Sequence, residues 1–303
     1  MHAERPADAT AIPAIVTIRQ LAATIFPPTR PLTIEHVPEG VSTFVYRIAR
    51  GDERFYLRVL PEADASFAPE VGVHQQLRAR GVGVPAVIHF EHRNAALQRS
   101  VMVTREMPGH ALDRSGLDRH TPAILHRAGQ DLATINSLSV NGFGWVERDH
   151  DDTTRLTAPH STCRAFSLEH RAADLALLSA TMLDATERAA IERILDVADP
   201  WLIAERGHLA HGDLDATHIY QHHGTYSGII DFGELRGADR WYDLGHFHLH
   251  DGERLPAPLL PWLLAGYRSV TPLPDDAELR IAISRLAKAI RNSASSGRGV
   301  TER

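Results

Sequence analysis

The sequence predicts an α+β protein that is rich in strands at its start and mainly helical afterwards. Two alternating strand patterns meet at a hairpin turn within residues 43–60. After residue 121, apolar residues recur three and four positions apart, which is typical of amphipathic helices. Met107-Pro108-Gly109 is a strong breaker between the two patterns. We therefore predict three segments: 1–106, a helical part 107–292, and a disordered tail 293–303.

Composition limits the classes of protein that fit. A chain of 303 residues can hold two separate hydrophobic cores, and its 43% hydrophobic content is ordinary for a globular protein. The formal net charge of -6 argues against nucleic-acid binding, and the single cysteine, Cys163, excludes a disulfide framework. Neither a signal peptide nor a long apolar run is visible. We expect a cytoplasmic protein that binds neither nucleic acid nor membrane, as a monomer or a dimer.

The first part of the chain predicts one short helix around residues 16–25, followed by strands over 43–49 and 54–60. In the second strand Arg58 breaks the apolar character of its face. A solvated edge arginine is the ordinary explanation. Because Lys288 is the only lysine in the chain, any cation that holds phosphate in this part must be another residue type.

A helix should follow, with Pro69 in its first turn and its end near residue 80. Glu70 could face the sheet and pair with Arg58, or could be an exposed acid that the helix dipole favours. The loop before the strands, with Gly40, Ser42 and Thr43, could place N–H groups and hydroxyls around phosphate. Its ordinary interpretation is a plain loop.

The remaining elements follow from the same patterns. Strands are expected at 86–90 and 100–106. Helices are expected at 121–135, 165–182, 184–198, 254–270 and 276–291.

A second hairpin carries the candidate chemistry. Residues 217–221 and 226–230 form short strand patterns around a turn that contains Gly224. If they pair, His218 falls nearly opposite residue 230, so Asp231 lies beside it and one divalent ion could touch both side chains. Asp213, in the preceding loop, could accept a proton there. A chance arrangement is the alternative, because the chain holds 38 acidic residues and 19 histidines.

His211-Gly212-Asp213-Leu214 together with Ile230-Asp231-Phe232-Gly233 resembles the aminoglycoside phosphotransferase family, the small-molecule branch of the protein-kinase-like fold. The resemblance implies a two-lobe fold: an N-lobe with a small antiparallel sheet and one helix, and a larger, mainly helical C-lobe. It makes Asp213 the catalytic base, His218 and Asp231 the metal ligands, and Asp243 a buried brace of the catalytic loop.

The same resemblance implies ATP or GTP as the phosphate donor and Mg²⁺ as the metal. Histidine at position 218 replaces the usual asparagine, which makes Mn²⁺ possible as well. Leu57-Arg58-Val59 would bring Arg58 to the phosphates with Glu70 as its partner. The hinge from Thr104 through Glu106 to Met107 would face the base.

We therefore expect an O-phosphotransferase that acts on a hydroxyl of a small molecule, most simply an aminoglycoside-type antibiotic. A macrolide kinase, a metabolic kinase of small alcohols or sugars, a catalytically weak nucleotide-binding pseudokinase, and nucleotidyl rather than phosphoryl transfer stay open. His246 and His250 should share a helix face, either solvated or in the wall of the acceptor pocket.

Overall fold

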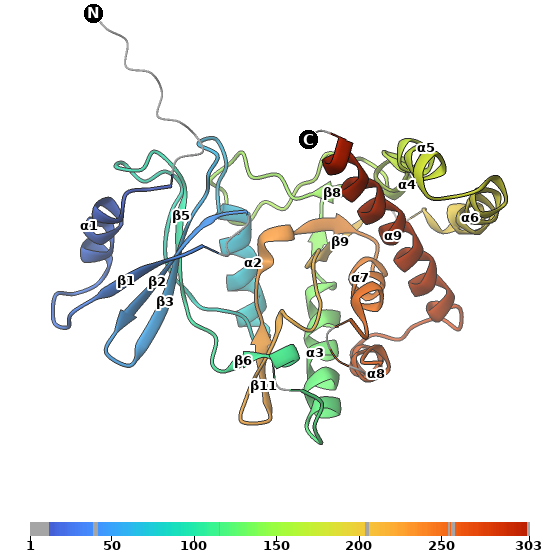
Figure 1. Ribbon diagram of the computed structural model, residues 1–303. Helices are drawn as coiled ribbons and strands as arrows, with labels where there is room; N and C mark the ends of the chain where they lie inside the picture. The colour runs from blue at the N-terminus through green and yellow to red at the C-terminus, as the bar shows by residue number, and fades with distance from the viewer. Residues whose placement is uncertain are drawn as a thin grey trace, which may run out of the picture. The chain divides into compact units, whose positions relative to one another are not determined.

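The computed structural model describes residues 12–38, 42–114, 116–203, 206–253, 255 and 258–301, with side chains as far as residue 295. The chain forms two compact units (Figure 1). The first contains residues 1–107 and 147–155, and the second contains residues 108–146 and 156–303. The predicted α+β class is confirmed.

A five-stranded antiparallel sheet in the order β1-β2-β3-β5-β4 forms the centre of the first unit. The elements of this unit are α1 (Ile15–Ile25), β1 (Thr33–Val37), β2 (Phe44–Arg50), β3 (Glu53–Val59), α2 (Ala68–Ala79), β4 (Val87–Glu91) and β5 (Val101–Arg105). Strand β1 was not predicted, because it lies at the edge of the sheet and alternates weakly, with most side chains exposed.

The two helices of the first unit cover opposite faces of the sheet (Figure 1). Helix α1 packs on the face that holds Phe55, Leu57 and Val59. Arg58 lies on the other face, where Phe67 and the residues of α2 pack. The alternation along β3 therefore separates an apolar core from the face that carries the charged pair.

The second unit combines nine-residue and longer helices with two small sheets, in the orders β11-β10-β6 and β7-β9-β12-β8. Its elements are β6 (His110–Ala111), η1 (Leu112–Arg114), α3 (Thr121–Ile135), β7 (Ser139–Val140), β8 (Gly144–Trp145), α4 (Cys163–Leu168), α5 (Arg171–Thr181), α6 (Ala185–Ala198), η2 (Asp199–Trp201), β9 (Gly207–Ala210), β10 (Ile219–His222), β11 (Thr225–Ile229), η3 (Phe232–Glu234), β12 (Arg236–Ala238), α7 (Tyr242–His250), α8 (Leu260–Val270) and α9 (Ala277–Thr301).

Helices α3 and α8 approach each other at backbone distance, because each presents a glycine to the other. A Cβ on Gly129 would lie 1.9 Å from the carbonyl oxygen of Leu263, and one on Gly266 would lie 1.8 Å from that of His126. Any side chain at either position would force the two helices apart. This contact fixes α3, which in turn supplies Asn136 to the site described below.

Two predictions about helices need correction. Helix α9 continues to Thr301, so residues 293–301 are helical and not the disordered tail expected from residue 293. The reason is packing, because Ile290 and Ala294 extend the buried stripe of α9 against α5. The single helix expected over 165–182 is instead two helices, α4 and α5. None of the helices in the described ranges has the length and apolar character that a membrane crossing requires.

Candidate active site

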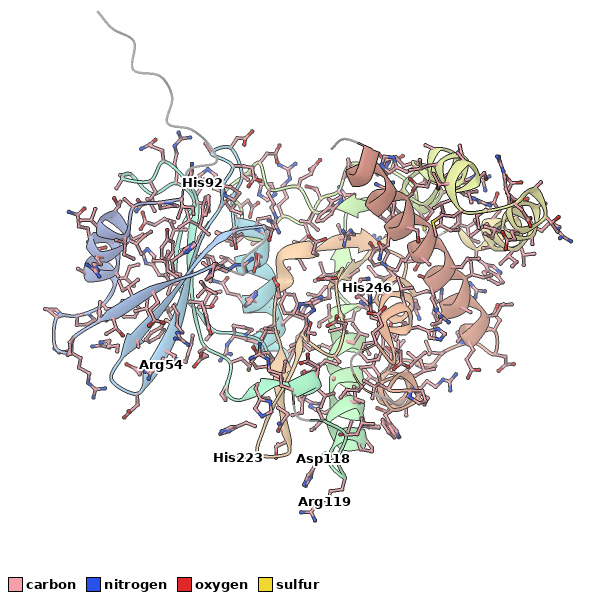
Figure 2. All side chains as sticks on the ribbon, in the orientation of Figure 1. Arg54, His92, Asp118, Arg119, His223 and His246 are labelled. Atoms are coloured by element: carbon pink, nitrogen blue, oxygen red, sulfur yellow. The ribbon has the colours of Figure 1, made fainter. Side chains whose placement is uncertain are left out.

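The β10–β11 hairpin has the predicted pairing. Ile219 lies opposite Ile229, and the N–H of Ile230 donates to the carbonyl of His218 at 3.0 Å. His223 and Gly224 form the turn with φ values of 52° and 75°, as expected for a two-residue hairpin of type I′. His223 lies at the exposed tip, away from the site (Figure 2).

The imidazole of His218 is oriented by a backbone group. Its Nδ1 lies 2.6 Å from the carbonyl oxygen of Asp213. Because a carbonyl only accepts, Nδ1 carries the proton, and Nε2 keeps a lone pair that can bind a metal. That Nε2 lies 3.9 Å from Oδ2 of Asp231. Two metal–ligand bonds of about 2.1 Å can span this gap, so the pair fits one divalent ion.

Asp231 has left-handed backbone geometry, with φ of 63° and ψ of 67°. Few residues other than glycine adopt this region, and aspartate is among those that tolerate it. The turn ends β11 and leaves the Asp231 side chain half exposed and beside His218. Strain of this kind is found at functional positions and has to be held by the surrounding structure.

The predicted brace of the catalytic loop is present. The buried carboxylate of Asp243 accepts hydrogen bonds from the backbone N–H of His211 and of Gly212, both at 2.9 Å. Its third bond, at 3.0 Å, comes from the side-chain amide of Asn136 at the end of α3. Nε2 of His211 in turn contacts the carbonyl of Ile230 at 2.8 Å. These contacts tie the loop to β11.

The Asp213 carboxylate is about half exposed and faces His246 of α7. Nε2 of His246 lies 3.1 Å from Oδ1 of Asp213, within ion-pair distance, although the ring is not aligned for a hydrogen bond. Burial raises the pKa of Asp213, but His246, His218 and His211 outweigh it and hold the pKa below its usual range. Asp213 is therefore ionised at neutral pH and can accept a proton. His246, which the sequence left between two interpretations, lines the site (Figure 2).

In the first unit, the sheet and helix α2 bring together the predicted charged pair. Nη1 of Arg58 donates to Oε1 of Glu70, and the guanidinium lies over the ring of Phe67. Pro69 and Glu70 occupy the first turn of α2, as predicted. Glu70 is buried, and its second oxygen, Oε2, has no hydrogen-bond partner in the described structure. The pair leaves Arg58 with further donors.

The other expected nucleotide contacts are placed unevenly. Gly40 lies outside the described residues. Ser42 is exposed, whereas Thr43 is buried and accepts a bond from Nε of Arg58 at 3.4 Å. Thr104 pairs with Tyr56 and Val87 inside the sheet, and the N–H of Glu106 donates to Arg54. The side chain of Glu106 accepts a bond from the Tyr56 hydroxyl.

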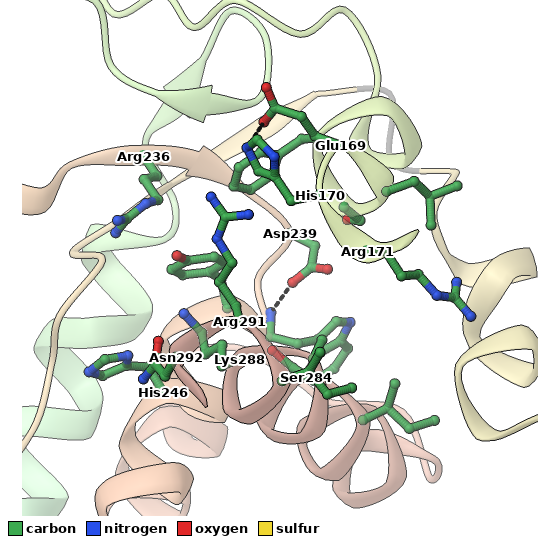
Figure 3. A pocket seen from close by; sticks show the side chains of 18 of the residues that line it. Glu169, His170, Arg171, Arg236, Asp239, His246, Ser284, Lys288, Arg291 and Asn292 are labelled. Carbon is green, nitrogen blue, oxygen red and sulfur yellow. Dashed lines mark hydrogen bonds and ion pairs between the residues drawn. The ribbon is translucent and has the colours of Figure 1, made fainter. Parts of the chain in front are cut away.

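A cavity of about 800 Å³ opens beside Asp213 within the second unit. Its wall contains aromatic rings from several helices and strands, among them Trp145, Trp241 and Tyr242. Figure 3 shows Arg236, His246 and Lys288 around this space. Lys288 and Arg236 were not singled out from the sequence, because amphipathic spacing gives burial and not the pocket a residue reaches.

The fold and these side chains define a small-molecule kinase. The chain belongs to the phosphotransferase enzyme family, APH, whose sequence pattern matches residues 33–281.

Solved structures support the same fold. A putative aminoglycoside phosphotransferase from Ralstonia eutropha has 15% sequence identity and a TM-score of 0.68, over 95% of this chain and 90% of that chain. Macrolide 2'-phosphotransferase MphH from Brachybacterium faecium has 16% identity and a TM-score of 0.56, over 93% and 97%. A thermostable mutant of aminoglycoside phosphotransferase APH(4)-Ia, solved with AMP-PNP and hygromycin B, has 17% identity and a TM-score of 0.63, over 89% and 88%. A search of curated proteins finds no match.

Proposed function

We propose that the protein transfers the γ-phosphoryl group of ATP or GTP to a hydroxyl of a small molecule that binds in the 800 Å³ cavity. One observation carries the proposal. An ionised carboxylate, Asp213, opens into the cavity, and the next side chains along the hairpin, His218 and Asp231, face each other across 3.9 Å. This combination supplies a base and a cation site together.

The roles follow from the contacts. Asp213 orients the acceptor hydroxyl and takes its proton. The acceptor oxygen then forms a bond to the γ-phosphorus, the bond to the bridging oxygen breaks, and a nucleoside diphosphate leaves. Arg58, aimed by Glu70, contacts the phosphates of the donor. Asp243 keeps Asp213 in position through the backbone of its loop.

The donor set suits a divalent ion, since it offers one imidazole nitrogen and one carboxylate oxygen. His218 and Asp231 would hold Mg²⁺ or Mn²⁺, and such an ion neutralises charge on the transferring phosphate groups. Within the described residues, no set of three His, Cys, Asp or Glu side chains converges on one point. A two-ligand site is consistent with magnesium, which commonly keeps waters and binds substrate phosphates.

An aminoglycoside-type acceptor is the first candidate from the family, and the alternatives are a macrolide or a smaller alcohol or sugar. Aminoglycosides are polycations, which need several unpaired carboxylates. The cavity wall contains as many arginine and lysine side chains as aspartate and glutamate side chains, and three histidines besides. Its charge therefore does not favour a polycation.

The test is a transfer screen with product mass spectrometry. The protein is incubated with ATP or GTP, Mg²⁺ or Mn²⁺, and a panel of aminoglycosides, macrolides, sugars and small alcohols. We expect a product that has gained one phosphoryl group, and an Asp213→Asn variant that loses roughly 10² to 10⁴ in rate. Asp275→Asn, at an exposed position, is the matched control. Gain of a nucleotidyl group, or full activity in Asp213→Asn, would contradict the proposal.

A further inference from the structure

Lys288, the only lysine in the chain, lies in the wall of the cavity with 9% of its surface exposed. Its Nζ is 3.1 Å from the centre of the Tyr242 ring. Among the described residues, no carboxylate lies within 4.0 Å of this ammonium group, and no protein atom accepts a hydrogen bond from it. An ammonium group has three donors and cannot accept. Its donors are therefore left for something else in the cavity.

The other charges of the cavity are already satisfied. Each arginine and each carboxylate in its wall has a partner: Arg171 with Asp196 and Asp199, Arg236 with Glu234, Arg280 with Asp276, Arg291 with Asp174, Glu169 with His170, Asp213 with His246, and Asp239 with the N–H of Trp241. Lys288 is the exception in this part of the structure, so the cavity has one positive charge without a counter-charge and no unpaired negative one.

We propose that Lys288 binds a carboxylate of the acceptor, so that the cavity takes hydroxy acids in preference to polycations. This inference rests on the proposed function, because it assumes that the cavity beside Asp213 is the acceptor site. The aromatic rings of Trp145, Trp241 and Tyr242 suit the body of such a compound. Its hydroxyl would point to Asp213.

The electrostatics agree with this role. Burial lowers the pKa of Lys288 well below its usual range, and the nearby Arg236 lowers it further. Asp243 and Asp239 act in the opposite direction without pairing with it. A bound carboxylate would stabilise the charged form of the lysine, and the lysine would replace the water that the carboxylate loses.

A structural role is the competing explanation. In that case Lys288 would serve only to offset the buried charges of Asp239 and Asp243. Both carboxylates already accept backbone hydrogen bonds, from Trp241 and from His211 and Gly212. A structural lysine predicts that its removal lowers stability and leaves the charge preference for ligands unchanged.

Binding can be measured without nucleotide through the fluorescence of the cavity tryptophans. The probes are hydroxy acids (mandelate, phenyllactate, quinate), each paired with its neutral amide, and kanamycin as the polycation. We expect the favoured acid to bind at least about tenfold more tightly than its amide, since hydrogen bonds to charged groups are worth that much. Lys288→Met should bring this ratio near one. Lys288→Arg should keep a preference for the acid.

Arg285→Met is the matched control, because Arg285 lies on the same helix and is exposed outside the cavity wall. It should leave every affinity unchanged. The inference is overturned if no acid is preferred over its amide, if kanamycin binds most tightly, or if Lys288→Met leaves the ratio intact. It is also overturned if Lys288→Met weakens binding of AMP-PNP and not of the acid, because the anion would then be a nucleotide phosphate.

Reductive methylation gives a second measurement that does not depend on a variant folding. Lys288 is the sole lysine, so peptide mapping separates its labelling from that of the N-terminus. The bound acid should slow methylation of Lys288 several-fold and the amide should not. Equal labelling in both would contradict the inference.

The proposed function fails separately. Asp213-dependent transfer to neutral or cationic acceptors only, without acid binding, would keep the kinase assignment and remove this inference. Lys288-dependent acid binding without transfer to any hydroxyl would do the reverse.

Discussion

Nδ1 of His218 donates to the backbone carbonyl of Asp213, so the proposed metal ligand and the proposed base are joined by one 2.6 Å hydrogen bond. This contact closes the loop between them and fixes which ring nitrogen faces Asp231. The base and the cation site therefore cannot move independently. A change at position 218 should affect both the metal requirement and the position of Asp213.

The metal preference should depend on position 218. His218→Asn replaces an imidazole nitrogen with an amide oxygen, which Mg²⁺ prefers. We expect the ratio of activity with Mg²⁺ to activity with Mn²⁺ to rise, while His218→Ala raises the metal concentration for half-maximal activity by at least about tenfold with either ion. Activity is measured in metal titrations of the three proteins. An unchanged half-maximal concentration in His218→Ala would exclude this residue as a ligand.

The charged pair of the first unit should govern donor binding. Arg58→Ala removes a charge-assisted contact, so KM for the nucleotide should rise by roughly tenfold to a hundredfold. Glu70→Gln keeps the shape of the side chain and removes the charge that aims Arg58, so a smaller rise is expected. In the double variant the two effects should not add, because both act through one contact.

Arg54→Ala is the control for these variants. Arg54 lies on the same strand, and its guanidinium donates to carbonyls of the adjoining turn, Gly51 and Glu53 (Figure 2). Its KM should match that of the unmodified protein. If Arg54→Ala and Arg58→Ala raise KM equally, the effect is a general loss of positive charge and not a phosphate contact.

Asp243 should be needed for both stability and turnover. In Asp243→Asn one acceptor oxygen becomes an NH₂ group that faces a backbone N–H, so a buried donor loses its partner. The expected cost is about 1–3 kcal/mol in the free energy of unfolding. The rate should also fall, since His211 and Gly212 position Asp213. Urea unfolding and initial rates measure the two effects, with Asp275→Asn as the control. Unchanged stability would mean that the loop does not depend on this brace.

Local patterns were enough to predict one part of the site and not the other. The β10–β11 hairpin and the Arg58–Glu70 pair follow from alternation, turn residues and a proline in the first turn of α2, all of which act over a few residues. The left-handed backbone of Asp231 and the contact of Lys288 with Tyr242 do not.

The second group depends on packing between distant segments. Lys288 reaches the cavity because α9 packs on α7, which begins at Tyr242. Periodicity along α9 marks position 288 as buried and gives no reason to expect an unpaired ammonium there. The length of α9 was missed for the same reason, since burial of Ala294 depends on α5 and not on its own neighbours in sequence.

Stability should fall as the solution becomes acidic, and His74 of the first unit should contribute. Burial lowers the pKa of His74, outweighing Glu70 and the carbonyl of Pro85, which raise it. The unfolded chain takes up the proton near pH 6.5, whereas the folded chain does so at lower pH. The stabilisation from neutral His74 is therefore complete above about pH 6.5 and is lost as the pH falls toward the folded pKa.

His246 and His248, whose pKa values burial also lowers, act with the same sign. Each unit of pKa difference corresponds to about 1.4 kcal/mol. We expect the free energy of unfolding to decrease between about pH 7.5 and about pH 5, and to decrease less in His74→Gln, whose amide can still donate to the carbonyl of Pro85. Chemical denaturation at several pH values measures both curves. If they are parallel over this range, His74 is protonated equally in the folded and unfolded chains, and its burial does not govern the acid sensitivity.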